Sequence, residues 1–191
     1  TVSNTIILML GVGLLSTLLG VSTAWVVTRY NFFGKNFFQW ALLLPAAVPA
    51  YIIAYTYTDF LEYAGPVQKI LREFFNFQNS NDYWFPEIRS MEGAIFVMSF
   101  VLYPYVYMTT RASFLTVPIS FFQTSLIYGR SSFFSVALPL ARPGIIAGVA
   151  LVLMETISDF GTVEYFALET LTLGVFTVSY THLRAHETTH D

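Results

Sequence analysis

Cysteine is absent from this chain of 191 residues, and charged residues make up only 11% of it. The absence of cysteine excludes disulfides, thiolate metal ligands and a cysteine nucleophile. Soluble domains carry about 25% charged residues, so the low charge content argues against a water-soluble enzyme. The net charge of −3 offers no basic surface to a nucleic acid. No Walker phosphate-binding motif occurs, so ATP would have to bind to another polypeptide. We therefore expect no catalytic residues, no cofactor, no stably bound metal and no nucleic-acid partner.

The sequence does contain long runs of uncharged residues. Runs of 24, 23 and 18 uncharged residues cover positions 5–28, 36–58 and 93–110. About 20 apolar residues are enough for a helix to cross a bilayer. Pro45 and Pro49 interrupt the second run, which a kinked membrane helix tolerates better than a soluble helix does. These runs predict an all-α integral membrane protein, a polytopic helical bundle in contact with the lipid bilayer.

The later apolar runs are less clear. Residues 143–154 form a run of 12 uncharged residues that ends before Glu155. A fourth span over residues 143–163 therefore requires Glu155 to lie within the membrane. A further span begins near Leu171. Residues 112–129 are also uncharged but rich in hydroxyl side chains, and we expect a helix on the membrane surface there.

The charges of the connecting segments predict an orientation. The connections after the first and third spans carry only bases, namely Arg29, Lys35, Arg111, Arg130 and Arg142. The connection from residue 59 to residue 92 carries six acids and three bases. Lys and Arg gather in the cytoplasmic loops of membrane proteins. The two basic connections therefore face the cytoplasm, and the acidic connection faces outward.

Two local patterns predict how helices begin and pack. Gly65-Pro66 is typical of a helix start, and we expect the helix that follows to lie flat on the outer surface. Small residues recur at intervals of four in the first and fourth spans: Ser16, Gly20, Ala24, Gly144 and Gly148. This spacing lets helix backbones approach closely, so it indicates packing between helices.

The basic connection after the third span carries a pattern that can transmit force. It contains Gln123-Thr124-Ser125 followed by Gly129, and then a hydrophobic stretch that ends in Leu138-Pro139 before Arg142-Pro143. A glycine permits a tight turn after a short helix. A surface helix held between two spans in this way can pass a push from a partner protein to the helical bundle.

This pattern resembles the cytoplasmic loop of the permease subunits of binding-protein-dependent ABC importers, which reads E-A-A-x-x-x-G before a hydrophobic residue and L-P. Gln123, Thr124 and Ser125 stand at the E-A-A positions, so none of those letters matches. The interval from Gly129 to Pro139 is also shorter than in the family. Either residues are missing, or Leu126 takes the place of the family glycine. The resemblance implies that this loop, from Gln123 to Pro143, docks onto an ATPase.

Three longer strings resemble the ferric-iron importer permeases more narrowly: residues 42–68, 103–114 and 137–166. The resemblance covers residues 1–178 and implies a MetI-like permease fold, a truncated first half of a fused chain, in the bacterial inner membrane. It implies ferric iron as the substrate. It also implies a periplasmic substrate-binding protein, a cytoplasmic ATP-binding subunit and a second permease half or a homologous permease as partners. An importer of thiamine or another small solute, an ion-coupled secondary transporter and a membrane scaffold stand as alternatives.

Two acids in the fourth span are candidates for the substrate path. Glu155 lies about 18 Å into the span, past the bilayer centre. Asp159 follows at i+4, on the same face of a continuous helix. An acid in a span is costly and marks a functional candidate, and hard cations prefer carboxylate oxygens. Alternatively, Glu155 makes a structural contact and Asp159 caps a turn at Gly161.

The last residues differ from the rest of the chain. Residues 179–191 hold all three histidines, His182, His186 and His190, at a helical spacing that metal ligands also use. The composition changes abruptly at this point, where the family would continue with an apolar span. We expect this segment to be a non-native tail and not a metal site.

Overall fold

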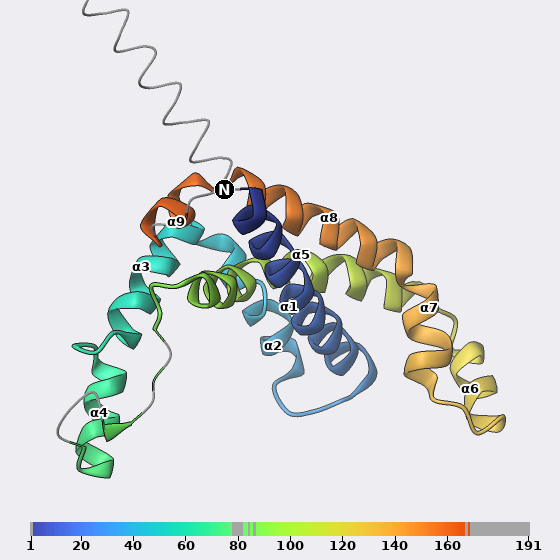
Figure 1. The fold of residues 1–191 in the computed structure, drawn as a ribbon. Coiled ribbons are helices and arrows are strands. Elements are labelled where there is room, and N and C mark those ends of the chain that lie inside the picture. Colours follow the sequence, from blue (N-terminus) through green and yellow to red (C-terminus); the bar gives the residue numbers. More distant parts are fainter. Residues whose placement is uncertain (1, 78–81, 84, 86, 167, 169–191) are drawn as a thin grey trace, which may run out of the picture. The chain divides into compact units, whose positions relative to one another are not determined.

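The computed structural model describes residues 2–77, 82, 83, 85, 87–166 and 168 (Figure 1). The regular structure of those residues is helical, which confirms the predicted all-α class. Its elements are α1 (Val2–Arg29), α2 (Lys35–Ala41), η1 (Leu44–Ala47), α3 (Ala50–Leu61), α4 (Pro66–Phe75), α5 (Met91–Thr116), α6 (Ile119–Ile127), the π-helical turn η3 (Phe133–Ala137), α7 (Leu138–Leu140), α8 (Arg142–Ser158) and α9 (Phe160–Tyr165).

The described chain divides into two compact units. Unit 1 contains residues 2–11, 49–98 and those from 156 on, and unit 2 contains residues 12–48 and 99–155. Within the described residues, two helices, α1 and α5, are long and apolar enough to cross a membrane by themselves. Up to four spans result if each of two bent helix pairs is counted as one span. Residue 171 and the three histidines lie outside the described residues.

The helices of the structure differ from the apolar segments predicted from the sequence in three places. The segment 36–58 is not one kinked helix but α2, η1 and α3, because Val48 and Pro49 adopt extended backbone angles. Helix α5 continues to Thr116, so within the stretch 112–129 the separate helix α6 covers only Ile119–Ile127. The segment 143–163 is also divided, because α8 ends at Ser158 and α9 starts anew.

Small residues bring the helices of unit 2 together. A Cβ added at Gly20 of α1 would lie 2.7 Å from the Cβ of Val106 on α5. A Cβ at Gly148 of α8 would lie 2.7 Å from the Cα of Val106, and a Cβ at Gly144 would lie 2.7 Å from the backbone oxygen of Thr109. Real side chains do not reach such distances, so only glycine allows these backbones to approach. The predicted close packing is confirmed.

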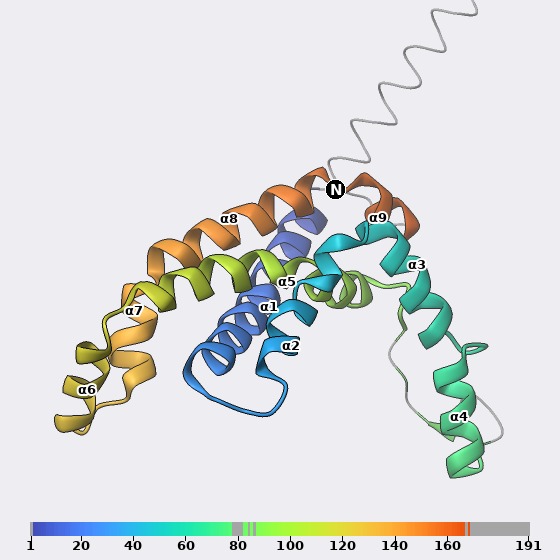
Figure 2. The ribbon, with the colours of Figure 1, turned by 180° about the vertical axis from the view of Figure 1, so that it is seen from behind.

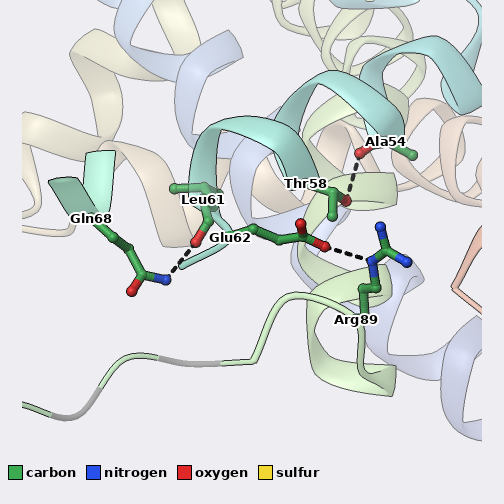
Figure 3. Close-up of polar contacts among 6 residues, drawn as sticks. All are labelled: Ala54, Thr58, Leu61, Glu62, Gln68 and Arg89. Atoms are coloured by element: carbon green, nitrogen blue, oxygen red, sulfur yellow. Dashed lines mark hydrogen bonds and ion pairs between the residues drawn. The ribbon is translucent and has the colours of Figure 1, made fainter. Parts of the chain in front are cut away.

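In unit 1, α4 begins at Pro66 after Gly65, as the sequence predicts. Its buried residue is Gln68, while the apolar side chains of Ile70 and Phe74 are exposed. The Gln68 side chain donates to the Leu61 backbone oxygen at 2.7 Å, as Figure 3 shows. Its own oxygen accepts from the Tyr83 hydroxyl at 2.6 Å. A polar side chain therefore holds α4 to the end of α3.

Candidate functional site

The connection between α5 and α8 folds into a short helical hairpin, which we call the α6–η3 hairpin (residues 117–141). Helix α6 and the turn that follows it lie beside η3 and α7 in both views of unit 2 (Figures 1 and 2). Its η3–α7 arm, Phe133–Leu140, is bent by 59° against Arg142–Ser158. Leu138 and Pro139 are half-buried at this bend, whereas Arg142 and Pro143 are exposed.

Gly129 terminates α6 in a left-handed conformation, with φ of +63°. The Arg130 N–H donates to the Ser125 oxygen at 2.8 Å, and the Gly129 N–H donates to the Leu126 oxygen at 3.0 Å. This pair of hydrogen bonds is a Schellman motif, which satisfies the last carbonyls of a helix. The predicted tight turn at Gly129 is confirmed, and the left-handed backbone explains why a glycine stands there.

The three residues at the E-A-A positions have different surroundings. Ser125 is buried, and its hydroxyl lies 2.8 Å from the Ser132 hydroxyl across the turn. Gln123 and Thr124 are exposed. Thr124 also borders a shallow cavity of about 390 Å³ whose wall includes Tyr128 and Arg130. Ser125 therefore closes the hairpin, while Gln123 and Thr124 are available to another protein.

An aromatic cluster that sequence reasoning missed anchors the hairpin. The Trp25 ring of α1 lies 5.6 Å from Phe114 of α5, 6.2 Å from Phe122 of α6 and 5.1 Å from Phe133 of η3, measured between ring centroids. The Arg29 guanidinium lies 5.5 Å from the Phe122 ring, a distance at which a cation is attracted to an aromatic face. One tryptophan thus contacts three other elements of unit 2.

The sequence contained a partial signal for this cluster. Trp25 stands near the end of an apolar run, where an aromatic residue at the membrane edge is expected. Nothing in the sequence pairs it with phenylalanines about 90 to 110 residues further on. That pairing depends on where α5, α6 and η3 end, which is a property of the fold.

Arg111 does not lie in a loop, as the charge pattern suggested, but in the last part of α5. Its Nη2 donates to the side-chain oxygen of Gln39 in α2 at 2.9 Å. The Tyr107 hydroxyl donates to the Gln39 backbone oxygen at 3.4 Å. This pair of contacts holds α2 against α5 on the same unit that carries the hairpin.

The two candidate path residues occupy different local structures. Glu155 is half-buried within α8. Asp159 follows the end of α8 with extended backbone angles, and its Oδ1 accepts the Thr162 N–H of α9 at 3.0 Å. The expectation that both share one helical face is therefore wrong, because α8 ends at Ser158. Asp159 caps α9, as the alternative interpretation had it, and the role of both acids in a path stays a prediction.

An ion pair joins two segments of unit 1. Glu62 Oε1 lies 2.6 Å from Arg89 Nε, and the two side chains point toward each other in Figure 3. The Glu62 carboxylate raises the pKa of Arg89, with a smaller contribution from Tyr165. The Arg89 guanidinium also lies 5.4 Å from the Tyr165 ring, which packs edge-on against Tyr55 of α3. Arg89 thus links the end of α3 to α9.

The chain is similar in sequence to known membrane transport proteins. A family model described as "Binding-protein-dependent transport system inner membrane component" matches residues 16–180. The molybdenum transport system permease protein ModB of Haemophilus influenzae is 29% identical over 151 residues, which are 78% of this chain and 62% of that protein. The Fe(3+)-transport system permease protein FbpB 2 of the same organism is 27% identical over 177 residues, which are 91% of this chain and 30% of that protein.

A third relative carries a different substrate in its name. The probable sulfate transport system permease protein cysT of Chlorella vulgaris is 26% identical over 153 residues, 78% of this chain and 54% of that protein. The chain thus spans between 30% and 62% of the length of these three relatives. The match confirms the permease resemblance at the level of the family, while the names of the relatives divide among molybdenum, iron and sulfate.

Proposed function

The chain belongs to the family of binding-protein-dependent transport system inner membrane components, and from this premise we propose that it is a permease subunit that carries ferric iron across the bacterial inner membrane. In this proposal a periplasmic binding protein delivers the iron, and a separate ATPase subunit drives its passage. A second permease half or a homologous permease completes the pathway. The anchored α6–η3 hairpin is the observation that carries this proposal.

The hairpin supports the coupling part of the proposal. Gln123, Thr124 and Arg130 are exposed on it, so a partner protein can reach them. Trp25 connects the same hairpin to α1 and α5, both of which are long and apolar enough to span a membrane. Because packed aromatic rings transmit displacement better than a flexible loop does, a push on α6 would move the ends of both helices.

The charge of the candidate path favours a cation as the substrate. Glu155 lies within the apolar helix α8, and a carboxylate attracts a hard cation such as ferric iron. Molybdate and sulfate are anions, which a carboxylate repels and which bind instead to N–H groups and arginines. The iron-transport relative also matches 91% of this chain, compared with 78% for the molybdenum and sulfate relatives.

The experiment measures uptake in cells that lack the chromosomal gene and express the full-length protein. We expect accumulation of radioactive iron, and we expect Glu155→Gln to abolish it while the amount of protein in the membrane stays constant. Glu164→Gln is the matched control, because Glu164 is an exposed acid on α9. If the Glu155→Gln variant takes up iron at the wild-type rate, Glu155 does not line the substrate path.

An oxyanion importer is the second candidate, supported by the 29% identity to the molybdenum permease. The same cells supplied with labelled molybdate, sulfate or thiamine distinguish these substrates. An ion-coupled transporter would continue uptake after ATP depletion, whereas a scaffold would show none.

A further inference from the structure

An apolar groove of about 270 Å³ lies between the end of α1 and α2, within unit 2. One wall is α1 from Ser22 to Val27, and the other consists of Phe32, Phe38 and Leu42. Val26, Phe32 and Phe38 are partly exposed, so their apolar surface is open to whatever surrounds the protein. We call this feature the α1–α2 groove.

The two hydroxyl residues of the groove offer it no polar group. The Ser22 hydroxyl donates to the Leu19 backbone oxygen at 3.1 Å, and the Thr23 hydroxyl donates to the same oxygen at 2.6 Å. A hydroxyl that donates to a carbonyl of its own helix no longer needs a partner outside the helix. The groove therefore suits an apolar occupant, because a polar ligand would lose its hydrogen bonds to water there.

The charges around the groove have one sign. Arg29 ends α1, Lys35 begins α2, and no acid occurs anywhere in residues 1–58. Arg29 is exposed beside the Phe122 ring, and the Lys35 ammonium donates to Asn31 at 3.1 Å. A ligand with an apolar body and a negative head would match the groove and the two basic residues that neighbour its walls in sequence.

Exposed aromatic residues indicate where α2 lies. Phe33, Phe37 and Trp40 follow one another at spacings of four and three, and all three are strongly exposed. Aromatic side chains in such a stripe gather at the boundary between lipid and water. This stripe favours a position of α2 at the level where the acyl chains and headgroups of a membrane meet.

We propose that the α1–α2 groove binds part of one acyl chain of an anionic phospholipid, with the phosphate near Arg29 and Lys35. The volume is slightly below the lower limit of about 300 Å³ for pockets that hold drug-sized ligands. It accommodates part of an acyl chain, whereas a second helix of about 10 Å diameter requires a longer groove. The proposal is independent of the transported substrate.

The test uses the full-length protein, purified in detergent with equimolar phosphatidylglycerol and phosphatidylcholine, and counts retained lipids by native mass spectrometry. We expect one retained lipid, with phosphatidylglycerol preferred. Ser22→Trp places a large ring in the groove and should abolish retention. Leu14→Trp is the matched control, because Leu14 is an exposed residue of α1 outside the groove wall, and it should retain the lipid.

A charge variant tests the headgroup without filling the groove. Lys35→Gln should lower the preference for phosphatidylglycerol about fivefold while a lipid is still retained, because one basic residue near an anionic headgroup contributes about that factor. Lys69→Gln, on α4 of the other unit, should leave the preference unchanged. Equal retention of both lipids by the wild type overturns the proposal. The proposal is also overturned if Ser22→Trp and Leu14→Trp retain the lipid equally, or if the wild type is a dimer that retains no lipid.

Discussion

Two helical turns of this protein, one in each unit, are held in opposite ways. The α3–α4 turn of unit 1 is held by polar side chains: Gln68 bonds to Leu61 and Tyr83, and Arg72 bonds to the Tyr63 backbone oxygen at 2.8 Å. The α6–η3 hairpin of unit 2 is held mainly by the rings around Trp25. The Tyr83 hydroxyl links Gln68 and Arg72 into one small hydrogen-bond network, whereas in the hairpin one central ring supports several elements at once.

The difference matches what each region has to do in the proposed importer. A region held by hydrogen bonds between side chains can exchange one of these bonds for a bond to water and adjust locally. A region held by one shared aromatic cluster moves as a body, because the packed rings have few alternative arrangements. The hairpin that would receive the force of the ATPase is the one with the shared cluster.

The largest expected effect comes from Trp25→Ala. Truncation of a buried aromatic side chain costs about 3 kcal/mol or more, and we expect about 2 kcal/mol here because Trp25 is only half-buried. The hairpin should detach, so trypsin should cleave faster after Arg130, and uptake should fall with it. Trp40→Ala is the control, since Trp40 is a strongly exposed tryptophan on α2. Equal cleavage of the two variants would contradict the anchoring role.

A pair of glycine substitutions tests the two turns directly. Gly65 has an ordinary φ of −71°, but a Cβ there would lie 2.8 Å from the Phe60 carbonyl carbon and closer still to the Asp59 oxygen. Gly129 has a φ of +63° and open space around it. We expect Gly65→Ala to lower stability by about 1–2 kcal/mol through overpacking, and Gly129→Ala by about 1 kcal/mol through backbone strain.

Asparagine distinguishes the two causes, and thermal unfolding in detergent measures both. Gly129→Asn should be nearly neutral, because asparagine tolerates the left-handed conformation. Gly65→Asn should be at least as damaging as Gly65→Ala, because it adds atoms to an occupied space. If the two asparagine variants unfold at the same temperature, the distinction between space and conformation fails.

The smallest expected effect is that of Glu62→Gln, which removes the ion pair with Arg89. The Glu62 side chain is 38% exposed and the Arg89 side chain is 55% exposed. Water screens the attraction between charges at such exposed positions. Because the pKa of Arg89 is raised in the folded protein, its contribution to stability is lost only when the pH rises through that pKa. Arginine is charged over the whole physiological pH range in the unfolded chain as well, so this contribution should not vary with pH in that range. Thermal unfolding should shift barely, and less in high salt. A shift as large as that of Trp25→Ala would reverse the comparison.

Much of the fold could be predicted because the signals are local. The apolar runs located α1 and α5, Gly65-Pro66 located the start of α4, and Gly129 located the turn after α6. Helix ends were harder to place. Two prolines in 36–58 produced separate helices instead of one kink, and Asp159 left the helical path of α8 to cap α9. In each case a continuous helix competes with a local break or cap. The spacing of apolar residues in the sequence does not show which of the two is more stable.

The sequence by itself determined that this is a helical membrane protein, because hydrophobic length and charge distribution are properties of the chain at each point. Its glycines also determined where helices could meet. Only the tertiary structure decided which surfaces do meet: that Trp25 joins α1, α5, α6 and η3, that Gln39 receives Arg111, and that an apolar groove opens beside α2. Such contacts connect residues far apart in sequence, and their partners are set by helix ends and packing.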